Sequence, residues 1–141
     1  MSRRVTATIH LDALRHNLLQ VRARVPQSKV MAVVKADGYG HGLERVVRAL
    51  TDADAFGVAS IADGERIRAL GLTHRIVVLS GIDEPGDVQA MRALSLEPVI
   101  HHASQLPWLE ADTDPRPLSV WLKIDSGMHR LGFAPDDVAA V

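Results

Sequence analysis

A lysine at the end of an apolar run is the first candidate for chemistry. Lys35 follows the apolar residues 30–34, so it is expected at the carboxyl end of a buried strand, where α/β folds place their ligand sites. Apolar surroundings disfavour the ammonium form, and the neutral amine can attack a carbonyl group. The following loop holds Tyr39, the only tyrosine, whose phenol could bind an anion such as phosphate. It also holds three residues that let the backbone approach a ligand closely, namely Gly38, Gly40 and Gly42.

A second segment, residues 121–133, also combines charged and apolar residues at the end of a predicted strand. Lys123 stands between Trp121 and Ile124, and Arg130 follows seven residues later, after a glycine-containing turn. Two cations near one pocket require an anion between them. Taken alone, the segment is equally typical of a structural salt-bridge loop.

Other chemistries are not supported by the sequence. His101 and His102 would point to opposite faces of an extended strand, so they cannot chelate one metal ion as a pair, and no metal site is predicted. The glycines at 38, 40 and 42 lack the Gly-x-Gly-x-x-Gly spacing of dinucleotide-binding folds, and no phosphate-binding Gly-x-x-x-x-Gly-Lys-Ser/Thr motif occurs. Both nucleotide-dependent classes are therefore disfavoured.

The elements that must position these residues alternate along the chain. An apolar stripe with helical spacing predicts a helix over 11–25 that ends at Pro26. Short apolar runs predict five strands, and helical patterns separate them. The strands are expected at 29–34, 55–59, 75–79, 98–100 and 118–124, and further helical segments at 43–50, 61–70, 84–94, 104–110 and 135–141.

This alternation predicts right-handed crossovers and a parallel sheet, hence the α/β class. Either a doubly wound sheet or a β/α barrel would satisfy it. A barrel requires eight strands and typically about 250 residues. Five units that end within a helical segment favour a partial TIM-type (β/α)8 barrel, truncated before closure, with residues 1–141 as the amino-terminal part of that domain.

Composition restricts the partners. Sixteen Lys and Arg residues balance 17 Asp and Glu residues for a net charge of −1, so the sequence predicts binding neither to nucleic acid nor to anionic membranes. No cysteine is present, which favours a reducing compartment. Arg3 and Arg4 are not followed by the apolar stretch of a signal peptide, and no run of about 20 apolar residues could span a bilayer. We therefore expect a cytoplasmic protein.

Both chemical segments resemble one family, the alanine racemases, which use pyridoxal 5′-phosphate on a fold-type III barrel. Residues 32–42, AVVKADGYGHG, are similar to the family's cofactor-lysine signature, and residues 121–133, WLKIDSGMHRLGF, resemble its second signature. The order and separation of the two segments also match, and the resemblance covers essentially the whole chain.

The resemblance implies roles for four residues. Lys35 would hold the cofactor covalently and move the α-proton on one face of bound alanine, and Tyr39 would bind the cofactor phosphate. Arg130 would contact the substrate carboxylate region. Lys123 would be carbamylated, and the added negative charge would hold Arg130 in place. The complete protein is expected to be a homodimer that interconverts L- and D-alanine.

The sequence departs from the family in two respects. Asp37-Gly38 stands where members commonly have Asn or Asp followed by Ala. The family barrel is also longer, and a following β domain, absent from these 141 residues, supplies the second base. We therefore expect the chain alone to show weak cofactor binding and no turnover. A non-catalytic carrier of pyridoxal phosphate, built as a single barrel, is the alternative, and a partly folded truncated product is a third possibility.

Overall fold

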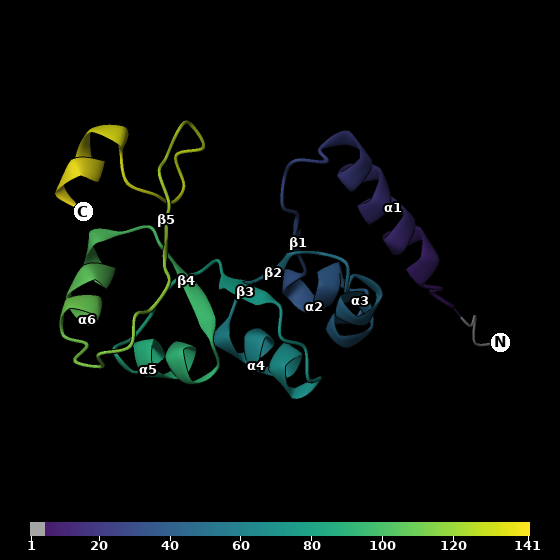
Figure 1. Cartoon of the computed structure of the whole chain (residues 1–141), viewed down its shortest axis with the longest axis horizontal. Helices are drawn as coiled ribbons and strands as arrows, with labels where there is room; N and C mark the ends of the chain where they lie inside the picture. The colour runs from purple at the N-terminus through teal and green to yellow at the C-terminus, as the bar shows by residue number, and fades with distance from the viewer. Residues whose placement is uncertain (1–4) are drawn as a thin grey trace.

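A computed structural model describes residues 5–141 and contains one sheet of five parallel strands (Figure 1). Arg3 and Arg4 lie outside the described residues. Each strand pairs with the next one along the chain, in the order β1-β2-β3-β4-β5. The strands are β1 (Met31–Val33), β2 (Ala55–Val58), β3 (Arg75–Val78), β4 (Leu96–Ile100) and β5 (Trp121–Leu122).

This sequential order separates the two architectures that the sequence left open. In a doubly wound sheet the strand order reverses at a switch point, whereas a β/α barrel adds each new strand beside the last. No reversal occurs among the strands of residues 5–141. The α/β class and the partial barrel are therefore confirmed.

Helices connect the strands and cover one face of the sheet. Figure 1 shows α3 (Leu43–Ala49), α4 (Ile61–Ala69) and α5 (Gly86–Ala93) on the same side of the strands. The remaining helical elements are α1 (Leu11–Arg24), α2 (Lys35–Tyr39), α6 (Leu106–Glu110) and the 3₁₀ segments η1 (Ala103–Gln105) and η2 (Pro135–Ala140). In the part of the chain that the structure describes, no helix has both the length and the apolarity needed to cross a bilayer.

Local sequence sets the ends of α4. The hydroxyl oxygen of Ser60 accepts a hydrogen bond from the backbone N–H of Asp63 at 3.2 Å, which satisfies one of the unpaired amides of the first turn. After the last turn the chain reverses at Gly71, whose φ of +77° suits glycine. Ser60 and Gly71 therefore mark the two ends of the helix that the apolar pattern predicts over 61–70.

The core lies between the sheet and these helices. Phe56, Val58, Ile76 and Val78 are completely buried and pack in one cluster with apolar residues of α3, α4 and α5. Burying one such side chain contributes about 1.5–3 kcal/mol, so this layer supplies most of the drive to form the sheet. The alternate residues Val77 and Val99 are also buried, as expected for central parallel strands.

The first strand differs from its prediction. The apolar run predicts a strand buried on both faces, but Met31 and Val33 are 36% and 38% exposed, whereas Val34 is 1% exposed. The strand pairs only with β2, because it lies at one edge of the described sheet. One face of β1 is covered by helices. Met31 and Val33 lie on the other face and are exposed, because β2 is the only strand beside them in the described sheet.

The last strand and the last helix are also shorter than predicted. Residues 118–124 were expected to be extended, but regular pairing with β4 covers only Trp121 and Leu122. Beyond them, the backbone of Lys123 bonds both to β4 and to the loop that follows. The segment 135–141 forms 3₁₀ turns at Pro135–Ala140 rather than an α-helix.

Candidate active site

The structure places all four predicted site residues after the carboxyl ends of strands. Lys35 follows β1 by two residues, with Tyr39 in the same turn, and Lys123 directly follows β5, with Arg130 in the next loop. This edge is where β/α barrels carry their active sites. The two pairs belong to the outermost strands, so β2, β3 and β4 separate them within the sheet.

The turn after β1 is left-handed. Five successive residues have positive φ angles, namely Ala36 (54°), Asp37 (54°), Gly38 (64°), Tyr39 (53°) and Gly40 (79°). A left-handed residue other than glycine costs about 1–2 kcal/mol, because its Cβ approaches a carbonyl oxygen. Such strain persists only where the surroundings hold it, and it is concentrated at functional sites. The segment labelled α2, from Lys35 to Tyr39, therefore has an unusual left-handed backbone that its surroundings must stabilise.

Backbone hydrogen bonds close this turn. The N–H of Gly38 donates to the carbonyl of Val34 at 2.9 Å, and the N–H of Gly42 donates to the carbonyl of Asp37 at 2.8 Å. A Cβ atom at Gly38 would lie 3.0 Å from Cγ2 of Val46, so this position has little room for a side chain. The glycine spacing pointed to an unusual loop, but it did not reveal that Ala36, Asp37 and Tyr39 share its conformation.

Asp37 is a site residue to which sequence reasoning gave no role. Its Oδ1 atom accepts the backbone N–H of Leu43 at 2.9 Å and a guanidinium N–H of Arg66 at 3.0 Å. These bonds, that of Leu43 first, lower the pKa of the Asp37 carboxyl below its ordinary value. Arg66 comes from α4, and its position on the solvent side of the helical pattern gave no signal of this contact.

The loop after β5 is closed by its own backbone. The N–H of Phe133 donates to the carbonyl of Lys123 at 2.9 Å, and the N–H of Asp125 donates to the carbonyl of Phe133 at 2.8 Å. Gly132 has a φ of +118°, and a Cβ there would lie 2.8 Å from the nitrogen of Asp125. Only glycine allows the two ends of the loop to approach so closely.

Asp125 organises the interior of that loop. Its Oδ1 accepts the backbone N–H groups of Gly127 at 3.1 Å and His129 at 2.9 Å. These bonds, that of His129 first, lower the pKa of the Asp125 carboxyl. The loop holds its shape immediately before Arg130, whose side chain is exposed.

The two adjacent histidines make separate contacts. The imidazole of His101 donates from Nε2 to the carbonyl of Ser80 at 2.7 Å, while Nδ1 of His102 accepts the backbone N–H of Ser104 at 3.2 Å. Residues 5–141 contain no group of three His, Cys, Asp or Glu side chains placed to bind a metal ion.

Two side chains of the turn after β1 are of the types that could hold a phosphorylated aldehyde cofactor. Lys35 is half-buried and Tyr39 is 59% exposed. Within residues 5–141, neither side chain is engaged in a hydrogen bond or an ion pair. An amine and a phenol are therefore free to meet an aldehyde carbon and a phosphate at the same turn.

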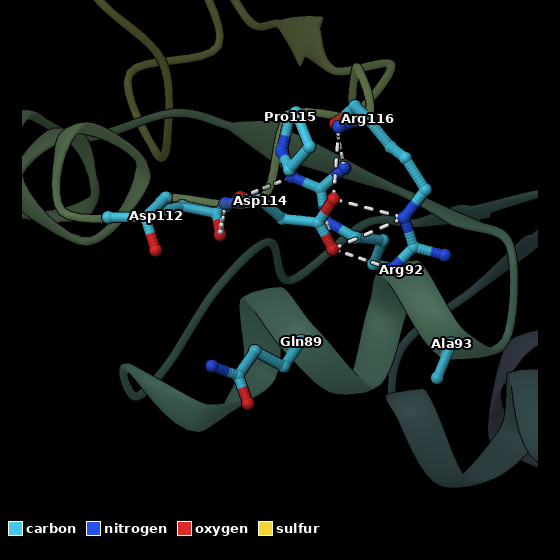
Figure 2. Close-up of a pocket in the computed structure, with 8 residues that line it drawn as sticks. Gln89, Arg92, Ala93, Asp112, Asp114, Pro115 and Arg116 are labelled. Carbon is cyan, nitrogen blue, oxygen red and sulfur yellow. Dashed lines mark hydrogen bonds and ion pairs between the residues drawn. The ribbon is translucent and has the colours of Figure 1, made fainter.

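A cavity of about 580 Å³ lies elsewhere, between α5 and residues 112–116 (Figure 2). It is found at the amino edge of the sheet, because α5 leads into β4 there and residues 112–116 precede β5. Its charges neutralise one another, since Arg92 binds Asp112 and Arg116 binds Asp114. It is therefore a salt-bridged surface hollow remote from Lys35, Tyr39, Lys123 and Arg130.

Comparisons with known proteins identify the family to which the chain is similar. Residues 9–141 match the family model described as "Alanine racemase, N-terminal domain". Two similar curated relatives are the alanine racemases of Vibrio cholerae, 48% identical over 93% of this chain, and Shewanella loihica, 47% identical over 96%. The chain spans 36% and 38% of the length of these relatives.

Solved structures show the same similarity. The biosynthetic alanine racemase of Pseudomonas aeruginosa matches 92% of this chain and 37% of its own, with a TM-score of 0.87 and 44% identity. The alanine racemase of Acinetobacter baumannii matches 89% of this chain and 38% of its own, with a TM-score of 0.83 and 38% identity. Sequence, fold and the two strand-end segments thus agree that this chain belongs to the alanine racemase family, within its amino-terminal domain.

Proposed function

We propose that this chain supplies the cofactor-binding, amino-terminal part of an enzyme that interconverts L- and D-alanine with pyridoxal 5′-phosphate. One observation carries the proposal: Lys35 and Tyr39 bracket the left-handed turn at the carboxyl end of β1. An aldehyde phosphate needs an amine and a phosphate-binding group, and the two ends of this turn supply an amine and a phenol.

Four side chains have separate roles in the proposed reaction. Bound pyridoxal 5′-phosphate would stabilise negative charge at the α-carbon of the substrate. Lys35 would hold the cofactor through its Nζ atom, and the same amine would take or return the α-proton on one face of alanine. The Oη atom of Tyr39 binds the phosphate. Arg130 binds near the substrate carboxylate, and a carbamate on Lys123 pairs with the Arg130 guanidinium.

Racemisation requires proton transfer on both faces of the α-carbon. Lys35 serves one face, so a second base must come from beyond these five βα units. Since the relatives are more than twice as long as this chain, we infer that the complete protein has a further domain. We also propose, from the family resemblance, that it acts as a cytoplasmic homodimer.

The test is borohydride trapping in the protein expressed from its complete reading frame. We expect reduction in the presence of pyridoxal phosphate to fix a pyridoxyl group on Lys35, and the protein to convert L-alanine to D-alanine. The variant Lys35→Ala should lose both, whereas Lys29→Ala, on the approach to the amino end of β1, should keep both. Trapping without alanine interconversion would favour a cofactor carrier, and the absence of trapping would overturn the proposal.

A further inference from the structure

Arg66 joins the left-handed turn to the neighbouring helix α4. One guanidinium nitrogen, Nη2, donates to Oδ1 of Asp37 at 3.0 Å and to Oε1 of Glu44 at 2.7 Å. A second nitrogen, Nε, donates to the same Glu44 oxygen at 2.9 Å. Glu44 therefore braces the guanidinium, which then reaches Asp37 across 29 residues of sequence.

Asp37 stands at the middle of the turn, two residues from Lys35 and two from Tyr39. Its Oδ1 atom is shared between Arg66 and the backbone N–H of Leu43, the first residue of α3. One carboxylate oxygen therefore ties the turn to two helices. Because its backbone is left-handed, with φ 54° and ψ 46°, these bonds hold a conformation that Asp37 would otherwise leave.

The contact is not explained by a general stabilising role. The side chains of Asp37 and Arg66 are 55% and 42% exposed, and exposed ion pairs contribute little to folding. What the pair does fix is the direction of the backbone between the two residues that the proposed function assigns to the cofactor.

We propose that Asp37 and Arg66 form a positioning pair, which holds the left-handed turn so that Lys35 and Tyr39 face the cofactor together. This inference rests on the proposed function. The pair touches neither cofactor nor substrate, and it acts through the backbone of residues 36–40.

Two measurements on the protein from the complete reading frame test the pair. The first is amide hydrogen exchange of residues 36–43 without cofactor, and the second is the dissociation constant for pyridoxal phosphate from absorbance titration. The variants are Asp37→Ala, which removes both bonds, Asp37→Asn, which keeps an acceptor for Leu43, and Arg66→Met. The control is the exposed pair Asp12 and Arg15, at 2.6 Å on α1, changed to Asp12→Ala and Arg15→Met.

We expect Asp37→Ala to speed exchange in residues 36–43 and to raise the dissociation constant roughly tenfold, the loss typical of a hydrogen bond to a charged group. Arg66→Met should do the same more weakly, Asp37→Asn should restore slow exchange at Leu43, and the α1 variants should change neither quantity. Because hydrogen exchange is measured without cofactor, it tests the positioning pair independently of cofactor binding. A wild-type protein that binds no pyridoxal phosphate would overturn the proposed function and leave the exchange result to stand. Unchanged exchange or unchanged affinity in Asp37→Ala overturns the positioning role.

Discussion

The Oδ2 atom of Asp125 lies 3.2 Å from Nδ1 of His129, while its other oxygen accepts the backbone N–H of the same histidine at 2.9 Å. Both contacts act on a residue with a φ of +56°. Asp125 thereby holds His129 in a left-handed conformation directly before Arg130. The direction in which Arg130 leaves the loop depends on this carboxylate.

Since the proposed function assigns the substrate carboxylate to Arg130, replacing Asp125 should impair substrate binding in the full-length protein. In Asp125→Ala the two amides lose their acceptor, the loop loosens, and Arg130 is no longer held at one place. We expect the KM for alanine to rise about tenfold in steady-state assays, with a smaller change in kcat. Asp136→Ala, an exposed acid in η2, is the control and should leave KM unchanged. An unaltered KM in Asp125→Ala would contradict the assigned role of the loop.

The same carboxylate predicts a pH dependence of stability. The pKa of Asp125 is lowered in the folded protein, chiefly by the N–H of His129, so its ionised form favours folding. That contribution is complete above the ordinary value of 3.8 and is lost as pH falls through the lower, folded pKa. In urea unfolding, the free energy of unfolding of the wild type should exceed that of Asp125→Asn above this pH range, and the two values should converge below it. A difference that persists in strong acid would contradict the linkage.

Gly38 should resist substitution more than its neighbour Gly40. Both have positive φ, but a Cβ at Gly38 would press on Val46 at 3.0 Å, whereas a Cβ at Gly40 meets nothing within 4 Å. We expect Gly40→Ala to lower the free energy of unfolding by about 1 kcal/mol and Gly38→Ala by more. Denaturant titration of both variants measures the difference, and equal losses would argue against the packing contact.

Trp121 should stabilise the short strand β5. Its indole N–H donates to Oε2 of Glu97 on β4 at 2.6 Å, beside the two-residue ladder of these strands. Trp121→Phe should cost about 1 kcal/mol and speed hydrogen exchange at the Lys123 amide, which bonds to Ile100 at 2.8 Å. Trp108→Phe on α6 should leave that amide protected. Slow exchange of the Lys123 amide in both variants would contradict the prediction, because the backbone pairing of β4 and β5 would then hold the strand without the Trp121 hydrogen bond.

Lys123 should carry one molecule of carbon dioxide as a carbamate in the active full-length enzyme. A negative charge there would pair with the Arg130 guanidinium, as the proposed function assigns. Mass spectrometry under bicarbonate should detect the adduct on the peptide that contains Lys123, and Lys123→Ala should lack it. An unmodified Lys123 in fully active enzyme would count against this role.

The carboxyl ends of the central strands were predicted well from the sequence, because a continuous apolar run is typical of a strand buried on both faces. Strands β2 and β3 were expected at 55–59 and 75–79 and occur within one residue of those limits. The exposure of Met31 and Val33 could not be foreseen, since it depends on which strands stand beside β1 rather than on the run itself.

Side-chain contacts between distant elements were harder to predict. A helical pattern marks Arg66 as solvent-facing, and nothing in that pattern tells which acid it meets 29 residues earlier. The Asp125 contacts are different, because an aspartate two residues before a glycine is a known turn signal. That signal is present at Asp125-Ser126-Gly127 and could have identified Asp125 as the residue that holds the predicted turn.

The strand order also bears on how the molecule forms during synthesis. Every strand docks on the one made just before it, so the ladder can lengthen from its first member as residues leave the ribosome. Each connection between successive strands contains only one or two short helical segments, which keeps the entropic cost of loop closure small at each addition. The surface that Lys35 borders is thus the earliest part of the sheet to be available for assembly.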